Sequence, residues 1–182
     1  MVVPATALEA EYAIAQNGTV YHAAIDLQEQ ERYDFYEPGF LGDRVPLKVN
    51  DVTLSGDCNP CEFAWSGNSA ITFARGNYTL SFNAPLHENH FMVVFDEPRN
   101  VTISLPHGLD VRNPALGMIT PGGLVLPGRE NGTAITWNHT KTAEIRFYDE
   151  GRESLLYIFA NFWIIIAVVL LLPFLLTWRK KG

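Results

Sequence analysis

Short runs of alternating apolar and polar residues fill most of the chain. In Tyr78-Thr79-Leu80-Ser81-Phe82 the apolar side chains fall on one face of an extended strand and the hydroxyl side chains on the other. Gly, Pro, Asn and Asp, which favour turns, separate such runs. The pattern predicts strands at 11–15, 19–27, 45–54, 69–75, 77–84, 90–96, 99–105, 132–137 and 142–148. Arg75-Gly76-Asn77 is the hairpin turn expected between two of them.

Many short strands of this kind predict an all-β domain over residues 11–149. The architecture that fits them best is an antiparallel β-sandwich, immunoglobulin-like in its arrangement. Strands of a parallel sheet that is covered on both faces read instead as continuous apolar runs. The stretch 106–131 is rich in Gly and Pro, and it predicts a long loop or two short strands with tight turns.

A different pattern begins at Ser154. The segment 154–178 contains no charged side chain, and a helix of that length spans about 37 Å, enough to cross a hydrocarbon core of about 30 Å. We therefore expect one transmembrane helix at 154–178. Tyr157, Trp163 and Trp178 stand where interfacial aromatic anchors occur.

The charge on the two sides of this helix predicts its orientation. Arg179, Lys180 and Lys181 follow it, whereas all 20 acidic residues precede it. Positive residues are retained in the cytoplasm, so residues 179–182 form a cytoplasmic basic tail and residues 11–149 lie outside the cell membrane. A body this acidic is a poor ligand for nucleic acid, because binding to phosphates needs clustered Lys and Arg.

An exported domain needs an export signal, and the first residues show neither a charged start nor a full apolar segment. We interpret residues 1–10 as the remnant of such a signal, with Ala5-Thr6-Ala7 as its cleavage end, or as a disordered N-terminus. The alternative is a tail-anchored protein whose body lies in the cytoplasm.

Five N-x-[ST] sequons lie on the side predicted to be outside, whereas composition alone predicts roughly one. We expect N-glycosylation at some of these asparagines. They are Asn17, Asn77, Asn100, Asn131 and Asn138. The alternative is local structure, because Asn and Gly favour turns and Thr favours strands.

Cys58 and Cys61 are the two cysteines of the chain, in C-x-x-C spacing. Outside the cell, a disulfide across this short loop is the simplest expectation. A redox site would need a helix to begin at the motif, and the residues after Cys61 lead instead to another strand. A metal site stays open as an alternative, because His87 and His90 would complete a tetrahedral set of two thiolates and two imidazoles for zinc.

The C-terminal half carries a resemblance to a known family. The motifs are Asp110-Val111-Arg112-Asn113-Pro114-Ala115-Leu116-Gly117, Thr120-Pro121-Gly122-Gly123, Ile135-Thr136-Trp137, and Arg146-Phe147-Tyr148 with the helix directly after it. In these motifs the chain resembles an uncharacterised family of archaeal membrane-anchored surface proteins. The resemblance implies an archaeal envelope protein, a β-domain followed by a membrane helix, with no assigned activity.

No G-x-S-x-G and no phosphate-binding loop accompanies these signals in the sequence. The sequence therefore predicts a non-enzymatic, single-pass, glycosylated cell-surface protein with a binding or structural role. Its expected partners are the lipid bilayer and other envelope or membrane proteins, and no cofactor is expected. Two alternatives remain: a surface module that binds zinc or does redox chemistry, and an accessory subunit of a membrane complex in which Asn161 packs against a partner helix.

Overall fold

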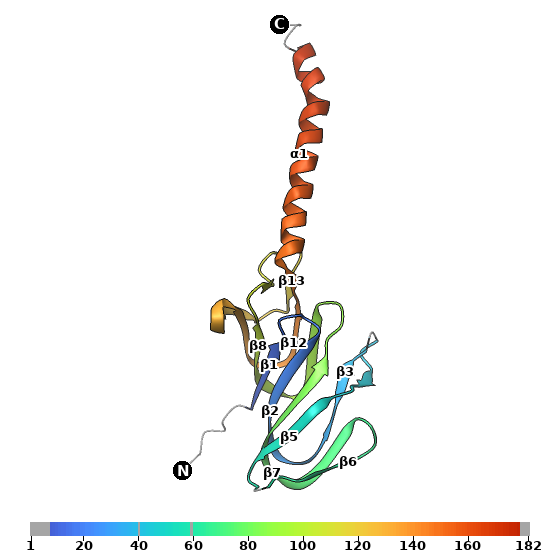
Figure 1. Ribbon diagram of the computed structural model, residues 1–182, viewed down its shortest axis with the longest axis vertical. Coiled ribbons are helices and arrows are strands. Elements are labelled where there is room, and N and C mark those ends of the chain that lie inside the picture. The colour runs from blue at the N-terminus through green and yellow to red at the C-terminus, as the bar shows by residue number, and fades with distance from the viewer. Residues whose placement is uncertain (1–7, 40, 59, 179–182) are drawn as a thin grey trace.

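The computed structural model describes residues 8–39, 41–58 and 60–178, which form a β-domain and one long helix (Figure 1). The elements are β1 (Glu9–Ile14), β2 (Val20–Asp34), β3 (Tyr36–Pro38), β4 (Arg44–Pro46), β5 (Asn50–Gly56), β6 (Phe63–Trp65), β7 (Ala70–Pro85), β8 (His90–Leu105), β9 (Leu109–Asp110), β10 (Met118–Ile119), β11 (Leu124–Pro127), a 3-10 turn (Arg129–Asn131), β12 (Thr133–Arg146), β13 (Tyr148–Asp149) and α1 (Glu150–Trp178). The predicted β-rich composition is confirmed.

One mixed sheet holds most of these strands. Its order is β10-β12-β8-β1-β2-β7-β5, with β11 paired to β12 and β6 paired to β7. β1 pairs parallel with β8, with Tyr12 opposite Ile103, and the other strand pairs of the described residues are antiparallel. The expectation of a purely antiparallel sheet is therefore wrong at β1, because the first strand inserts between β2 and β8 in the middle of the sheet.

Three pairs of predicted strands are single long strands in the structure. Runs 69–75 and 77–84 form β7, runs 90–96 and 99–105 form β8, and runs 132–137 and 142–148 form β12 and the start of β13. The predicted hairpin turn at 75–77 is wrong, since Gly76 lies within β7 and pairs with Gln30 of β2. The alternation is interrupted at these points because the strands bend there rather than end.

Each bend is a register shift at a residue with positive φ. The pairing of β2 with β7 shifts around Glu29, whose φ is 53°, and the pairing of β12 with β8 shifts around His139, whose φ is 55°. An extra residue in one strand kinks it and increases its twist. The long strands therefore change direction without losing their neighbours, and one sheet folds over itself.

The core lies between the central strands and their folded-over ends. In β1 the side chains of Ala10, Tyr12 and Ile14 are buried and those between them are exposed, so the central sheet buries one face. Phe35, which follows β2, packs on Phe82 of β7 with ring centroids 5.0 Å apart. β3 pairs with β4 and β9 pairs with β13 as separate two-stranded sheets beside the large mixed sheet, and this topology by itself does not establish an immunoglobulin-like sandwich.

α1 begins at Glu150, four residues before the apolar run. Asp149 caps it, because its Oδ1 accepts a hydrogen bond from the backbone N–H of Arg152 at 2.9 Å. Glu150 and Glu153 lie in the first turn, where acidic side chains suit the positive end of the helix dipole. Within the segment Glu150–Leu172 an 18-residue window has a mean hydropathy of 2.7, so the helix is long and apolar enough to cross a membrane. The residues that predicted its orientation, Arg179, Lys180 and Lys181, lie outside the described residues, as do residues 1–7.

Candidate binding site

Two cavities adjoin between the central sheet and its folded-over ends. The first, which we call the aromatic cavity, has a volume of about 200 Å³ and includes Tyr12, Tyr21, Phe82 and Phe91 in its lining. The second, the arginine cavity, has a volume of about 370 Å³ and includes Arg32, Arg44, Phe95 and Arg99. Tyr33, Tyr36 and Val93 line both. The two bends create this space, because they bring the far ends of β2 and β8 over the same face.

Tyrosine side chains from β1 and β2 meet Phe91 of β8 in the aromatic cavity. The ring of Phe91 lies 4.8 Å from that of Tyr12 and 4.9 Å from that of Tyr21, centroid to centroid. The buried hydroxyl of Tyr12 makes no hydrogen bond with any described residue. Burial, and then the nearby phenols of Tyr33 and Tyr21, raise the pKa of Tyr12 well above its usual value of 10.0. These phenols are therefore neutral hydrogen-bond donors at physiological pH.

The hydroxyl of Tyr36 links β3 to the first half of β8. It donates a hydrogen bond to the backbone carbonyl of Val94 at 3.0 Å. The guanidinium of Arg44 lies over the same tyrosine ring, with its Cζ 4.4 Å from the ring centroid. Tyr36 thereby separates the two cavities and holds β3 against β8.

Arg99 is the charged side chain at the bend of β8, opposite Thr140. Only 5% of its surface is exposed. Its Nη1 donates to the backbone carbonyl of Asp26, and its Cζ lies 5.3 Å from the centroid of the Phe95 ring. Its Nε makes no hydrogen bond, and the guanidinium takes part in no ion pair, with the residues that the structure describes.

The other two arginines of this cavity already have carboxylate partners. Arg32 pairs with Asp34 at 2.8 Å and Arg44 with Asp96 at 2.6 Å, both at the exposed rim. Sequence reasoning missed Arg99 because residues 97–98 read as a break between the predicted strands 90–96 and 99–105, which placed Arg99 at the start of a strand. The sequence did contain a signal, which is the arginine at the junction of two alternating runs. If the two runs form one bent strand, this arginine lies within the sheet.

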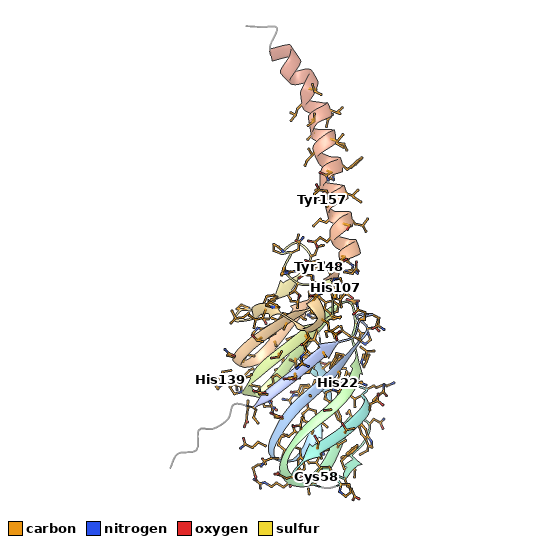
Figure 2. The ribbon with its side chains drawn as sticks, turned by 60° about the vertical axis from the view of Figure 1, so that its left-hand side comes forward. His22, Cys58, His107, His139, Tyr148 and Tyr157 are labelled. Atoms are coloured by element: carbon orange, nitrogen blue, oxygen red, sulfur yellow. A yellow bond between two sulfur atoms is a disulfide. The ribbon has the colours of Figure 1, made fainter. Side chains whose placement is uncertain are left out.

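A third recess lies where the β-domain meets α1, and we call it the juxtamembrane groove. Its volume is about 670 Å³, and Arg112, Tyr148, Glu153 and Tyr157 are among its lining residues. Figure 2 shows Tyr148 at the base of the helix and Tyr157 further along it. The guanidinium of Arg112 donates to both carboxylate oxygens of Asp110, from Nε to Oδ1 at 2.9 Å and from Nη2 to Oδ2 at 2.6 Å.

The loop between β9 and β10 ties the helix to the domain. The backbone N–H of Asn113 donates to the hydroxyl of Tyr148 at 3.1 Å, and its side-chain Nδ2 donates to Glu153 at 3.4 Å. A side chain at Gly117 would collide with the backbone carbonyl of Val111, so the tight return of this loop requires glycine. The segment Asp110–Gly117 thus holds the start of α1 against the β-domain through the hydrogen bonds of Asn113.

Four of the predicted glycosylation asparagines are exposed, and Asn100 is half-buried; the exposed ones are Asn17, Asn77, Asn131 and Asn138. Asn17 is in the turn between β1 and β2, where its Oδ1 accepts the N–H of Thr19 at 3.1 Å. Asn131 lies in the 3-10 turn and Asn138 at the bend of β12. Exposure at these positions does not show whether a glycan is attached.

Asn77 and Asn100 have a structural role as well. The Oδ1 of Asn77 accepts the N–H of Glu29 at 3.2 Å, and the Oδ1 of Asn100 accepts the N–H of His139 at 3.1 Å. Glu29 and His139 are the positive-φ residues of the two bends. Both asparagines therefore satisfy a backbone donor that the register shift leaves unpaired.

The cysteines and histidines of the zinc alternative are not brought together. Cys58 and Cys61 lie at disulfide-bonding distance, with Cα atoms 4.9 Å apart, and Figure 2 shows Cys58 at the end of the domain opposite α1. His90 pairs with Glu144 instead, at 2.8 Å between Nε2 and Oε1, and His87 forms a bridge with His90 in the turn before β8. Within residues 8–39, 41–58 and 60–178, no three His, Cys, Asp or Glu side chains form a group that could hold a metal ion.

Comparison with known proteins gives one result. Residues 65–180 match DUF5803, a family of unknown function. No curated protein matches the chain. The matched region runs from the end of β6 into the segment after α1, and it includes Arg99, the Asp110–Gly117 loop and the juxtamembrane groove.

Proposed function

We propose that this chain, which belongs to the family of unknown function DUF5803, is a single-pass membrane protein whose β-domain binds a ligand or partner outside the cytoplasm. The observation that carries the proposal is the exposure of the apolar side chains of α1. Side chains such as Ile158, Ile164 and Leu170 are 63%, 61% and 72% exposed, and the helix extends away from the domain (Figure 1). An apolar helix without a packed face needs lipid or partner helices around it.

The orientation in this proposal rests on charge. Arg179, Lys180 and Lys181 follow the helix, whereas the residues before it are strongly acidic. An archaeal envelope, N-glycosylation, the immunoglobulin-like arrangement of the two layers and the absence of catalysis are parts of the same proposal. Support for a binding role comes from the arginine cavity, where the buried guanidinium of Arg99 has no carboxylate partner within the part of the chain that the structure describes.

Labelling of single cysteines tests the orientation. In a Cys58→Ser/Cys61→Ser background, Asn68→Cys places a thiol in the exposed turn between β6 and β7, and Gly182→Cys places one in the tail. We expect a membrane-impermeant maleimide to label the first on intact cells and the second only after lysis. The reverse pattern would place the domain in the cytoplasm and overturn the proposal.

Fractionation tests the anchor. Ile165→Arg combined with Val168→Arg places two charges in the middle of the apolar segment, where each is costly in hydrocarbon. We expect the double variant to leave the membrane fraction, whereas the matched Ile165→Leu/Val168→Leu variant stays in it after alkaline carbonate extraction. Retention of the charged variant would contradict the assignment of α1 as the anchor.

A second candidate function is that of an accessory subunit. Asn161 is exposed on α1 amid apolar side chains, and an amide in hydrocarbon gains from a hydrogen bond to a neighbouring helix. Cross-linking in native membranes, with and without Asn161→Leu, tests it. A cross-linked species that disappears in the variant supports the subunit role, and an unchanged pattern contradicts it.

A further inference from the structure

The charge of Arg99 is buried, and no carboxylate of the described residues forms an ion pair with it. Arg32 and Arg44 of the same cavity each contact a carboxylate, whereas the guanidinium of Arg99 contacts a backbone carbonyl and the face of Phe95. A carbonyl and an aromatic ring offset part of the desolvation of a guanidinium, and a carboxylate offsets more. The protein therefore holds a buried cation in a state that a bound anion would stabilise.

The free end of the guanidinium indicates how an anion would bind. Nη1 donates to the carbonyl of Asp26, and Nε is buried and has no partner among the described residues. Nη2 is therefore the donor that remains for a ligand in the cavity. A carboxylate oxygen suits it, because a hydrogen bond between two charged groups is stronger than one between neutral groups.

The rim of the cavity indicates how much negative charge the site accepts. Asp34 and Asp96 neutralise Arg32 and Arg44, and Glu97 adds a further carboxylate to the lining. The lining thus holds as many carboxylates as guanidiniums, which disfavours polyanions such as nucleotides and polyphosphates. A monoanion can contact the guanidinium of Arg99, which has no ion-pair partner among the described residues.

The walls of the cavity indicate the rest of the ligand. Tyr33, Tyr36 and Phe95 supply aromatic surface beside Arg99, and the cavity volume is about 370 Å³. Small-molecule sites combine apolar walls with a few polar groups that fix orientation. An apolar body with one carboxylate fits this combination.

We infer that the arginine cavity binds a small organic monocarboxylate, whose carboxylate is held by Arg99 and whose apolar body lies against Tyr33, Tyr36 and Phe95. The inference rests on the proposed binding function and names its ligand class. It assigns Arg99 a role in recognition in addition to its contact with Asp26 across the sheet.

The test compares three probes of one shape on the full chain in detergent: benzoate, benzyl alcohol and benzylamine. The readouts are the thermal midpoint and the chemical shifts of backbone amides. We expect benzoate at millimolar concentration to raise the midpoint saturably and to shift amides of β2 and β8, and the neutral and cationic probes to do neither. Equal responses to all three probes, or no saturable response to benzoate, would overturn the inference.

Variants separate recognition from folding. Arg99→Lys keeps the charge but loses the planar guanidinium and its Nη2 donor, and we expect it to weaken benzoate binding by about tenfold or more. Arg75→Lys, which alters an exposed arginine that pairs with Glu29 outside the cavity, is the matched control and should bind as the unaltered chain does. If Arg99 serves the fold alone, Arg99→Lys changes the midpoint of the unliganded protein and leaves benzoate affinity unchanged, which contradicts the inference.

Failure here is distinguishable from failure of the proposed topology. Benzoate binding in detergent does not depend on which side of a membrane the domain faces. If the protein binds benzoate but the thiol in its β-domain is labelled only after lysis, the ligand class is supported and the extracytoplasmic location is rejected. If the thiol is labelled on intact cells but benzoate does not bind, the location is supported and the ligand class is rejected.

Discussion

The side-chain oxygen of Asn100 accepts a hydrogen bond from the backbone N–H of His139 at 3.1 Å, across the bend shared by β8 and β12. Asn77 makes the equivalent bond to Glu29 at the bend shared by β2 and β7. Two unrelated parts of the chain therefore use the same device: a positive-φ residue in one strand, and an asparagine of the neighbouring strand that accepts its N–H. These bends create the cavities, so the asparagines help to shape the candidate binding site.

Substitution of Asn100 tests this role in protein made without glycosylation. Asn100→Ala leaves the N–H of His139 without its acceptor, and we expect the free energy of unfolding to fall by about 1 kcal/mol. Asn100→Asp keeps an acceptor oxygen at the same place and should cost less in urea-denaturation measurements. Equal losses in the two variants would show that the hydrogen bond is not the source of the effect.

Alkaline pH should destabilise the domain. Burial raises the pKa of Tyr12 and of Tyr21 above 10.0, so the folded state holds these protons more tightly than the unfolded state does. The resulting stability is fully present below pH 10 and is lost as pH rises through the higher folded-state pKa values. We expect the thermal midpoint to fall above about pH 10 and the phenolate absorbance to rise as the domain unfolds.

Tyr12→Phe is the matched variant for that measurement. It removes a buried hydroxyl that lacks a partner among the described residues, so we expect an unchanged or higher midpoint at neutral pH and a weaker fall at alkaline pH. A variant whose midpoint falls as steeply as that of the unaltered chain would assign the alkaline transition to other groups.

The start of α1 depends on Asp149. Asp149→Ala removes the cap at the N–H of Arg152 and should destabilise the first turn by about 1 kcal/mol, whereas Asp149→Asn preserves the cap. Hydrogen exchange of the backbone amides of residues 151–153 measures this. Faster exchange in the alanine variant alone is the expected result, and equal exchange in both variants would exclude capping as the cause.

The link between Cys58 and Cys61 should contribute little to stability. It closes a loop of two intervening residues, and a short loop restricts the unfolded chain only slightly, by about 2 kcal/mol at most. We expect the Cys58→Ser/Cys61→Ser variant to stay folded, with a thermal midpoint lower by a few degrees. Loss of cooperative unfolding in this variant would show that the loop organises β5 and β6.

Glycosylation remains a prediction that mass spectrometry of protein from its native cells can test. We expect glycans at the exposed Asn17, Asn131 and Asn138. Thr19→Ala removes the first sequon without changing its asparagine and should remove one glycan mass. A protein without any glycan mass would leave local structure as the reason for all five sequons.

The sequence predicted the parts of this protein that depend on neighbouring residues. Alternation in Tyr78–Phe82 identified the buried face of β7, and the uncharged run after Ser154 identified the apolar helix. The C-x-x-C spacing of Cys58 and Cys61 identified the disulfide-distance pair. Each follows from local geometry: the twofold period of a strand, the length of a helix that spans a bilayer, and the reach of two nearby side chains.

Only the tertiary structure decided what depends on distant segments. Gly76 and Pro98 read locally as breaks, yet β7 and β8 continue through them, because pairing with β2 and β12 maintains the extended backbone across the register shifts. The parallel pairing of β1 with β8 and the contact of Arg99 with the carbonyl of Asp26 likewise join residues far apart in the sequence. Hydrogen bonds between strands and burial of side chains outweigh local turn preference at these points, and a single sequence does not display which strands will meet.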